Sequence, residues 1–249
     1  MSLSWSDTRA ALLPGRAVLA SGRGPAVSAE AGTGWEGALV ALQELLAEHR
    51  PSGAVSLTLS HHFLRLFLLD PPPTWLRHAE MAAWVAERLA DTLGGEAVWR
   101  HVWPQTLPGR PVPVCAIPAD RLDELQVLLA RHGSRPRHIR PWLDVIWSRR
   151  QRQLARATGW YALLEPGMAS LLRLARGRVI GLRQRHLGED LASDLGGMLH
   201  REALLAGLPP QGEVWLERAG PTPDLQAIGT GWRVHELAGP TDPGQALLS

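Results

Sequence analysis

The sequence predicts a mixed α/β protein built of two half-domains, each with a mixed sheet. Three observations lead to this prediction. Residues 159–185 read as three short strands in succession, a helix and a further strand follow them, and strands alternate with helices over the first 157 residues. No internal sequence repeat stands out, so we expect the halves to be duplicates in structure and not in sequence.

The first 70 residues are expected to hold four strands and one helix. Leu39, Leu42 and Leu46 share one helical face, and Pro51 ends this helix. Three prolines follow the last strand of the group. In chain order we expect strands at 17–20 and 26–28 around a turn at Gly22–Pro25, a helix at 35–49, and strands at 55–59 and 63–69.

Residues 74–157 complete the first half. Thr74 is a suitable N-cap, and Gly94 closes the helix that it begins. In chain order we expect a helix at 75–93, a strand pair at 97–103 and 112–117, a helix at 120–131, a strand at 137–140 and a helix at 141–157. We therefore assign residues 1–157 to a first half that contains an inserted α/β subdomain.

The second half is expected at residues 158–237. Its first turn is Glu165-Pro166-Gly167, in which proline presets φ and glycine accepts a positive φ. In chain order we expect strands at 160–164, 169–175 and 179–185, a helix at 188–206 and a strand at 213–216. Residues 238–249 contain proline and glycine without periodicity and are expected to form a loose tail.

The composition excludes several classes of protein. Apolar residues make up 45% of the 249 residues, which suffices for a core, and the net charge is only +2. All 26 basic residues are arginine, so a P-loop lysine or a Schiff base is excluded. The sequence has no run of 18 apolar residues and a single cysteine, Cys115, and its first 16 residues are not expected to be a secretory signal. We expect a cytoplasmic protein in which Cys115 is a small core residue.

Tryptophan is unusually frequent, with eleven residues against two phenylalanines and one tyrosine. A buried indole needs a partner for its N–H group. Several of these side chains are therefore expected at edges or contacts, which favours a protein that interacts with other proteins.

Four stretches of the chain resemble a known group of proteins. They are SLTLSHHFLRLFLLDPPP, IPADRLDELQVLLARHGSRPRHIRPWLDVIWSR, WYALLEPGMASLLRLARGRVIGLRQR and GEVWLERAGPTPDL. Together they resemble the actin-like proteins of type IV pilus assembly platforms and the actin-like cytoplasmic domain of the type II secretion L-type inner-membrane protein. The resemblance covers residues 54–230 and implies two ribonuclease-H-like (actin-like) half-domains.

The same resemblance implies a function. It is that of a non-enzymatic cytoplasmic scaffold of a bacterial pilus or secretion-like machine, peripheral at the inner face of the inner membrane. The partner would be an inner-membrane protein whose short cytoplasmic tail binds as an added strand or extended peptide. The resemblance also leaves room for a homo-oligomer and for contact with an anionic membrane surface.

The departures from the family pattern concern the nucleotide. Nucleotide-binding members carry Asp-x-Gly in the first hairpin turn of each half, where the carboxylate holds metal and water near the phosphates. The second half of this chain has Glu165-Pro166-Gly167, and Gly22–Pro25 of the first half has no carboxylate. Where the family has two adjacent glycines beside the adenosine, this chain has Glu217-Arg218-Ala219-Gly220. We therefore expect no nucleotide and no other cofactor.

An actin-like ATPase or kinase with an atypical phosphate site is the competing enzyme hypothesis. It would use Glu165 as the catalytic carboxylate, with Glu165, Gly167 and Gly220 around the nucleotide. The interpretation that we favour is that Glu165 is a turn carboxylate in solvent. His61 and His62 with Asp70, His78 and His101 could suggest a metal site, but none is expected, because adjacent residues of a strand point to opposite faces.

The segment 131–156 is rich in arginine with interleaved tryptophans. The favoured interpretation is a solvated helix face; an anionic membrane surface comes second and a nucleic-acid-binding module third. The residues that we expect to contact a partner are Arg137, Arg140, Trp142, Trp147 and Arg149.

Overall fold

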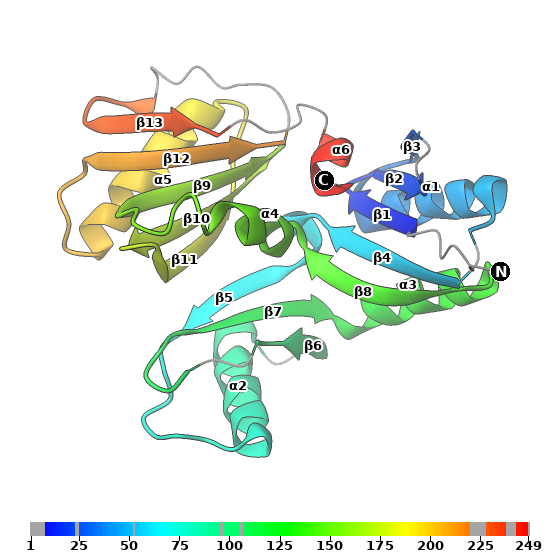
Figure 1. The fold of residues 1–249 in the computed structure, drawn as a ribbon, viewed down its shortest axis with the longest axis horizontal. Coiled ribbons are helices and arrows are strands. Elements are labelled where there is room, and N and C mark those ends of the chain that lie inside the picture. The colour runs from blue at the N-terminus through cyan, green and yellow to red at the C-terminus, as the bar shows by residue number, and fades with distance from the viewer. Residues whose placement is uncertain are drawn as a thin grey trace.

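The computed structural model describes residues 8–22, 25–51, 53–94, 97–104, 107–219, 228–237 and 243–248. Two five-stranded mixed sheets lie on either side of the molecule, and a three-stranded sheet forms a separate lobe beside them (Figure 1). The predicted mixed α/β class with two half-domains is confirmed.

The first half is a five-stranded sheet whose strand order is β3-β2-β1-β4-β8. Strands β1 and β2 form an antiparallel hairpin, whereas β1, β4 and β8 run parallel. The elements are β1 (Thr8–Leu13), β2 (Arg16–Ser21), β3 (Val27–Glu30), α1 (Gly34–His49), β4 (Gly53–Leu59) and β8 (Ser134–Pro141).

The second half repeats this arrangement in the order β11-β10-β9-β12-β13. Its first two strands are again an antiparallel hairpin, and β9, β12 and β13 run parallel. The elements are β9 (Gly159–Glu165), β10 (Met168–Ala175), β11 (Arg178–His186), α5 (Leu191–Leu205), β12 (Gly212–Arg218) and β13 (Trp232–Glu236). The halves are therefore duplicates in structure, although the sequence shows no repeat.

An insertion between β4 and β8 supplies the smaller lobe. Its sheet has the order β5-β7-β6, and Val85 and Leu89 of its helix pack on Val112 and Val114 in a core of its own. The elements are a 3-10 turn (His61–Phe63), β5 (Arg65–Leu69), α2 (His78–Leu93), β6 (Trp99–Val102), β7 (Val112–Pro118) and α3 (Ala119–Arg131). Helix α3 leaves this lobe and packs beside α1 on the outer face of the first sheet.

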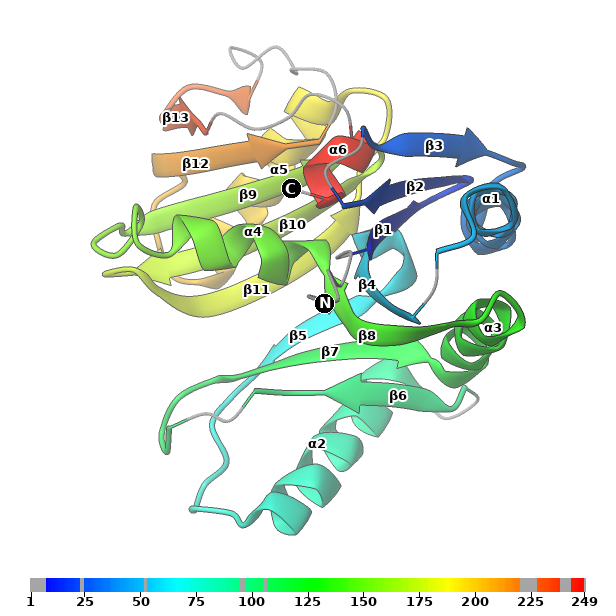
Figure 2. The ribbon, with the colours of Figure 1, turned by 45° about the vertical axis from the view of Figure 1, so that its right-hand side comes forward.

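Two helices lie between the two large sheets. They are α4 (Trp142–Arg150), which leads from the first half to the second, and α6 (Pro243–Leu248), which returns to β1 and β2 (Figure 2). One apolar cluster unites Leu13 and Val18 of the first sheet, Ile146 of α4, and Tyr161 and Leu163 of the second sheet. The space between the halves is thus a shared core.

The first hairpin of the first half was placed wrongly from the sequence. The strands expected at 17–20 and 26–28 correspond to β2 and β3 and do pair antiparallel, but β1 precedes both and forms the first hairpin with β2. The hairpin turn is therefore Pro14-Gly15, and Arg23 and Gly24 of the predicted turn lie outside the described residues. The stretch TRAALL shows no alternation, and Thr8 is its only β-branched residue; it forms a strand because both of its faces are covered, which overrides its low strand propensity.

Other helix and strand boundaries differ from the expected ones by a few residues. The C-terminal segment contains a helix where a loose tail was expected. The helix expected at 141–157 ends at Arg150. Within the segment expected to be a loose tail, Pro243–Leu248 form α6, where Leu248 is buried and its carbonyl accepts a hydrogen bond from Arg9 (2.9 Å). Cys115 is partly buried, as expected, and packs against two of the apolar clusters. Within the described ranges, every helix is too short or too polar to cross a membrane.

Candidate functional site at the joint between the halves

Two turns occupy equivalent places in the two halves. They are Leu13-Pro14-Gly15 after β1 and Glu165-Pro166-Gly167 after β9. Both glycines have a positive φ, +68° and +74°, which favours glycine. The backbone around them also matches, because Ser60 N–H donates to the Leu12 carbonyl (2.9 Å) and Ala219 N–H donates to the Leu164 carbonyl (2.8 Å).

The equivalence identifies the position at which the first half lacks a carboxylate. It is occupied by Leu13, which is 5% exposed and belongs to the shared core. The first hairpin turn of the first half therefore lacks a carboxylate, as expected, but this turn is Leu13-Pro14-Gly15 and not Gly22–Pro25. Only one of the two turns carries an acidic side chain, Glu165.

Glu165 is buried, with 2% of its surface exposed, so its interpretation as a solvated turn carboxylate is wrong. Its carboxylate crosses to the first half, where it accepts hydrogen bonds from the Ser60 hydroxyl and from the His61 backbone N–H (2.9 Å). Burial raises the pKa of Glu165 to about 7, although both hydrogen bonds act in the opposite direction. A metal ion or phosphate could reach this carboxylate only by displacing Ser60 and His61.

His61 lies beneath Glu165 and is fully buried. The Leu143 N–H donates to Nε2 (2.9 Å), so in the neutral ring the proton is on Nδ1. Nδ1 lies 2.8 Å from the Ser170 hydroxyl and 3.2 Å from the Glu165 carboxylate. Desolvation lowers the pKa of His61 to about 3. Above about pH 3 the ring is neutral, so its contact with Glu165 is not a charged pair.

His62 adds a contact on the outer side of the same bridge. Its Nε2 lies 2.8 Å from the Pro166 carbonyl, and its ring is 5.6 Å from that of His186. Burial lowers the pKa of His62, against the hydrogen bond to Pro166, which raises it. The loop after β4 thus grips the second-half turn from two sides.

A second polar cluster joins α4 to the second sheet. Arg150 donates to both oxygens of Glu217 (2.8 and 3.0 Å), and the Tyr161 hydroxyl donates to one of them (2.9 Å). Glu217 is 3% exposed. The hydrogen bonds to Glu217 raise the pKa of Arg150, and burial together with the Glu217 charge raises the pKa of Tyr161. Glu217 therefore serves to anchor α4; Gly220, the other residue named for this place, lies outside the described residues.

The predicted partner-binding residues divide into exposed and buried groups. Arg137, Arg140 and Arg149 are exposed. Trp142 is fully buried in the shared core, and Trp147 is partly buried, with its ring 5.6 Å from that of Tyr161. The tryptophans pack inside because α4 lies between two sheets, whereas the exposed arginines keep the solvated face that was expected of this segment.

The histidines considered for a metal site are dispersed. His61 and His62 hold the joint, whereas His78 and His101 stack on Trp103 in the smaller lobe. Over the described ranges, no three His, Cys, Asp or Glu side chains gather in a way that could hold a metal ion.

The buried Glu165 and His61 are expected to make the free energy of unfolding depend on pH. Between pH 4.5 and 7 folded Glu165 keeps a proton that the unfolded chain has released, so this group makes stability fall as pH rises; His61 acts in the opposite direction between pH 3 and 6.5. Glu165→Gln removes the first contribution. We expect the variant to gain about 3 kcal/mol relative to the wild type between pH 4.5 and 7.

Urea denaturation at intervals of pH measures this difference. Nearly flat stability of the wild type across pH 4.5–6.5, where the two contributions oppose, would agree with it. Parallel stability curves for the two proteins would show that Glu165 is not protonated in the folded state.

No protein-family model matches the chain, and no curated protein matches it. Solved structures do. PilM in the PilM-PilN type IV pilus biogenesis complex aligns with a TM-score of 0.66 and 14% identity over 97% of this chain and 89% of that one. The cytoplasmic domain of EpsL, an inner membrane component of the type II secretion system of Vibrio cholerae, aligns at 0.55 and 14% over 97% and 91%.

A third similar structure is a Bacteroides thetaiotaomicron protein with an actin-like ATPase fold and unknown function. It aligns with a TM-score of 0.59 and 9% identity over 90% of this chain and 85% of that one. At such identities the similarity establishes the fold, which is actin-like, as the resemblance implied.

Proposed function

We propose that this actin-like protein is a non-enzymatic scaffold of a bacterial pilus or secretion-like machine. It would act at the cytoplasmic face of the inner membrane and bind the cytoplasmic segment of an inner-membrane partner. Residues 1–157 and 158–237 would be its two halves. The fold supports the setting, since PilM and the EpsL domain, from such machines, align over 97% of the chain.

The observation that carries the proposal is the state of Glu165. Of the two equivalent turns, only the second carries an acidic side chain, Glu165. Its two carboxylate oxygens accept hydrogen bonds from Ser60 and His61, and the residue is 2% exposed. The place of the second carboxylate is taken by Leu13, in the apolar core. A triphosphate with its magnesium ion needs accessible oxygen ligands at this place. The joint supports a role in holding the halves together rather than in gripping a nucleotide.

Isothermal titration with Mg-ATP tests the non-enzymatic part. We expect no heat of binding at micromolar to millimolar ATP, for the wild type and for Glu165→Gln alike. Saturable binding that Glu165→Gln abolishes would contradict the proposal and favour the ATPase or kinase hypothesis.

Affinity purification from detergent-solubilised membranes of the native host tests the partner. We expect enrichment of an inner-membrane protein with a short cytoplasmic segment. Enrichment of no membrane protein at all, or recovery of nucleic acid that is lost on raising the salt concentration, would contradict it.

A further inference from the structure

Two unpaired sheet edges face each other beside α5. Strand β11 is the edge of the second sheet, and β5 is the edge of the small sheet. The edges meet where the Leu66 N–H donates to the Gln184 side-chain oxygen (2.8 Å). No backbone hydrogen bond joins them within the described residues, so both strands keep backbone groups that can accept another strand.

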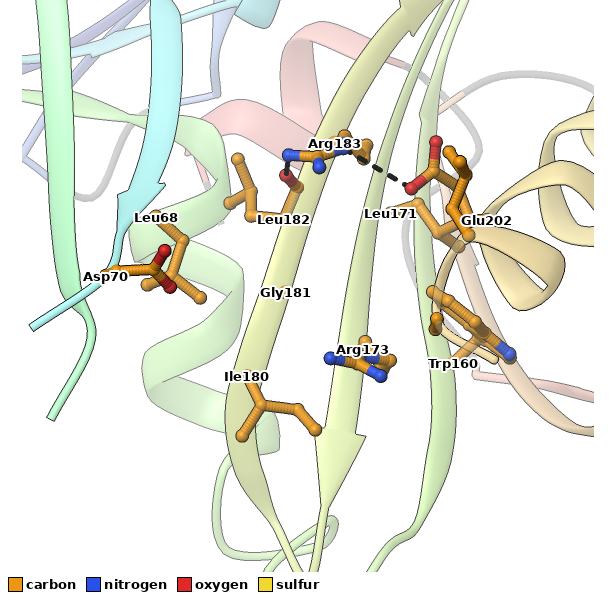
Figure 3. A pocket seen from close by; sticks show the side chains of 12 residues that line it. Leu68, Asp70, Trp160, Leu171, Arg173, Ile180, Gly181, Leu182, Arg183 and Glu202 are labelled. Carbon is orange, nitrogen blue, oxygen red and sulfur yellow. Dashed lines mark hydrogen bonds and ion pairs between the residues drawn. The ribbon is translucent and has the colours of Figure 1, made fainter. Parts of the chain in front are cut away.

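A hollow of about 340 Å³ lies beside this meeting point (Figure 3). Leu68 of β5 and Asp70, which follows this strand, bound it on one side, and Glu202 and Leu205 at the end of α5 bound it on the other. Part of its wall is apolar and open to solvent, since Leu205 is 67% exposed and Ile180 is 37% exposed. Such a wall suits the apolar side chains of an extended peptide.

Arg173 of β10 and Arg183 bring positive charge to the hollow, and Asp70 and Glu202 bring negative charge. Figure 3 shows the Arg173 side chain over β10, and Arg173 is paired across the strands with Gly181 of β11. A Cβ at position 181 would lie 3.2 Å from the Arg173 Cβ, so glycine leaves the room that this side chain uses. Arg173 forms no hydrogen bond or ion pair with any described residue, in contrast to Arg183, which pairs with Glu202 (3.3 Å). A partly buried arginine without a partner favours a carboxylate ligand.

The charged side chains of the edge strand β11 are all basic. Strand β11, RVIGLRQRH, contains Arg178, Arg183 and Arg185 and no acidic residue. Arg178 and Arg185 are exposed. A peptide added to this strand would therefore be favoured if its own charged side chains were acidic.

We propose that the hollow between β5, β11 and α5 binds an extended acidic segment of a partner protein, which adds a strand to β11 and places a carboxylate on Arg173. The inference rests on the proposed function in that this segment would belong to the inner-membrane partner. The surface is separate from the joint at Glu165 and from the exposed arginines of β8 and α4.

A fluorescein-labelled decapeptide of alternating valine and glutamate is the probe, measured by fluorescence anisotropy with the full chain. We expect saturable binding that Arg173→Glu weakens by about tenfold or more. Arg185→Glu on the exposed part of β11 should also weaken binding without touching the core. Arg131→Glu, at an exposed arginine of α3, is the matched control and should leave the affinity unchanged.

Strand addition is separated from simple charge attraction by two N-methylated versions of the probe. Methylation on the residues whose N–H groups face β11 should abolish binding, and methylation on the alternate residues should not. Equal effects of Arg173→Glu and Arg131→Glu, or equal binding of both methylated probes, would overturn the proposal. Probe binding at Arg173 in a chain that enriches no membrane protein would support this surface and overturn the proposed function instead.

Discussion

Trp142→Ala is expected to lower the free energy of unfolding by about 3–5 kcal/mol. Trp142 is fully buried, and it packs in the cluster that joins both large sheets to α4. Its ring centre lies 6.0 Å from that of His61, so the truncation also removes a wall of the polar joint. The cavity would be bounded by two separate sheets, which limits how far the surroundings can collapse into it.

The matched control is Trp75→Ala. Trp75 is 70% exposed in the smaller lobe, and its removal should change stability by no more than about 0.5 kcal/mol. Urea denaturation followed by far-ultraviolet circular dichroism measures both, because eleven tryptophans make fluorescence ambiguous. Similar losses for the two variants would show that Trp142 is not part of a shared core.

Glu217→Ala is expected to cost about 3 kcal/mol. The change removes the acceptor of three hydrogen bonds, two from Arg150 and one from Tyr161, and it takes the carboxylate away from the partly buried Arg150 guanidinium. Tyr161→Phe removes one of these bonds and should cost about 1 kcal/mol. Chemical denaturation of both variants at neutral pH measures the difference.

Glu213→Ala provides the comparison on the same strand. Glu213 pairs with Arg233 (2.9 Å) and with His235 at the surface, where water screens the interaction. Its loss should be much smaller than that of Glu217→Ala. If Glu213→Ala proved equally destabilising, the Arg150–Glu217–Tyr161 cluster would not be what anchors α4.

The order of elements could be predicted wherever local signals are strong. The Glu165-Pro166-Gly167 turn, the helix from Trp35 and the proline stop after Asp70 were all found at or near their places. Strand β1 was missed because TRAALL carries no strand pattern, and its conformation is decided by the layers that cover both of its faces. That miss moved the first hairpin turn from Pro14-Gly15 to Gly22–Pro25.

The site was predicted in part. The sequence identifies Glu165 as the one acidic residue in the right turn, but its partners Ser60 and His61 lie about a hundred residues earlier and no spacing rule connects them. The burial of Glu165, and hence the direction of its pKa, follows only from that contact. Trp142 was expected to contact a partner because tryptophan is common at interfaces; whether α4 faces solvent or a second sheet is not encoded in its own residues.

The course of the chain has a mechanical consequence. The polypeptide passes from one half to the other through α4 and comes back through α6, which ends against β1 with the Arg9 contact. A force that pulls the halves apart would strain the Glu165 bridge, the Glu217 anchor and the shared apolar cluster simultaneously rather than one after another. Attachments arranged in parallel fail only together, so separating the halves requires all three sets of contacts to be lost in one step.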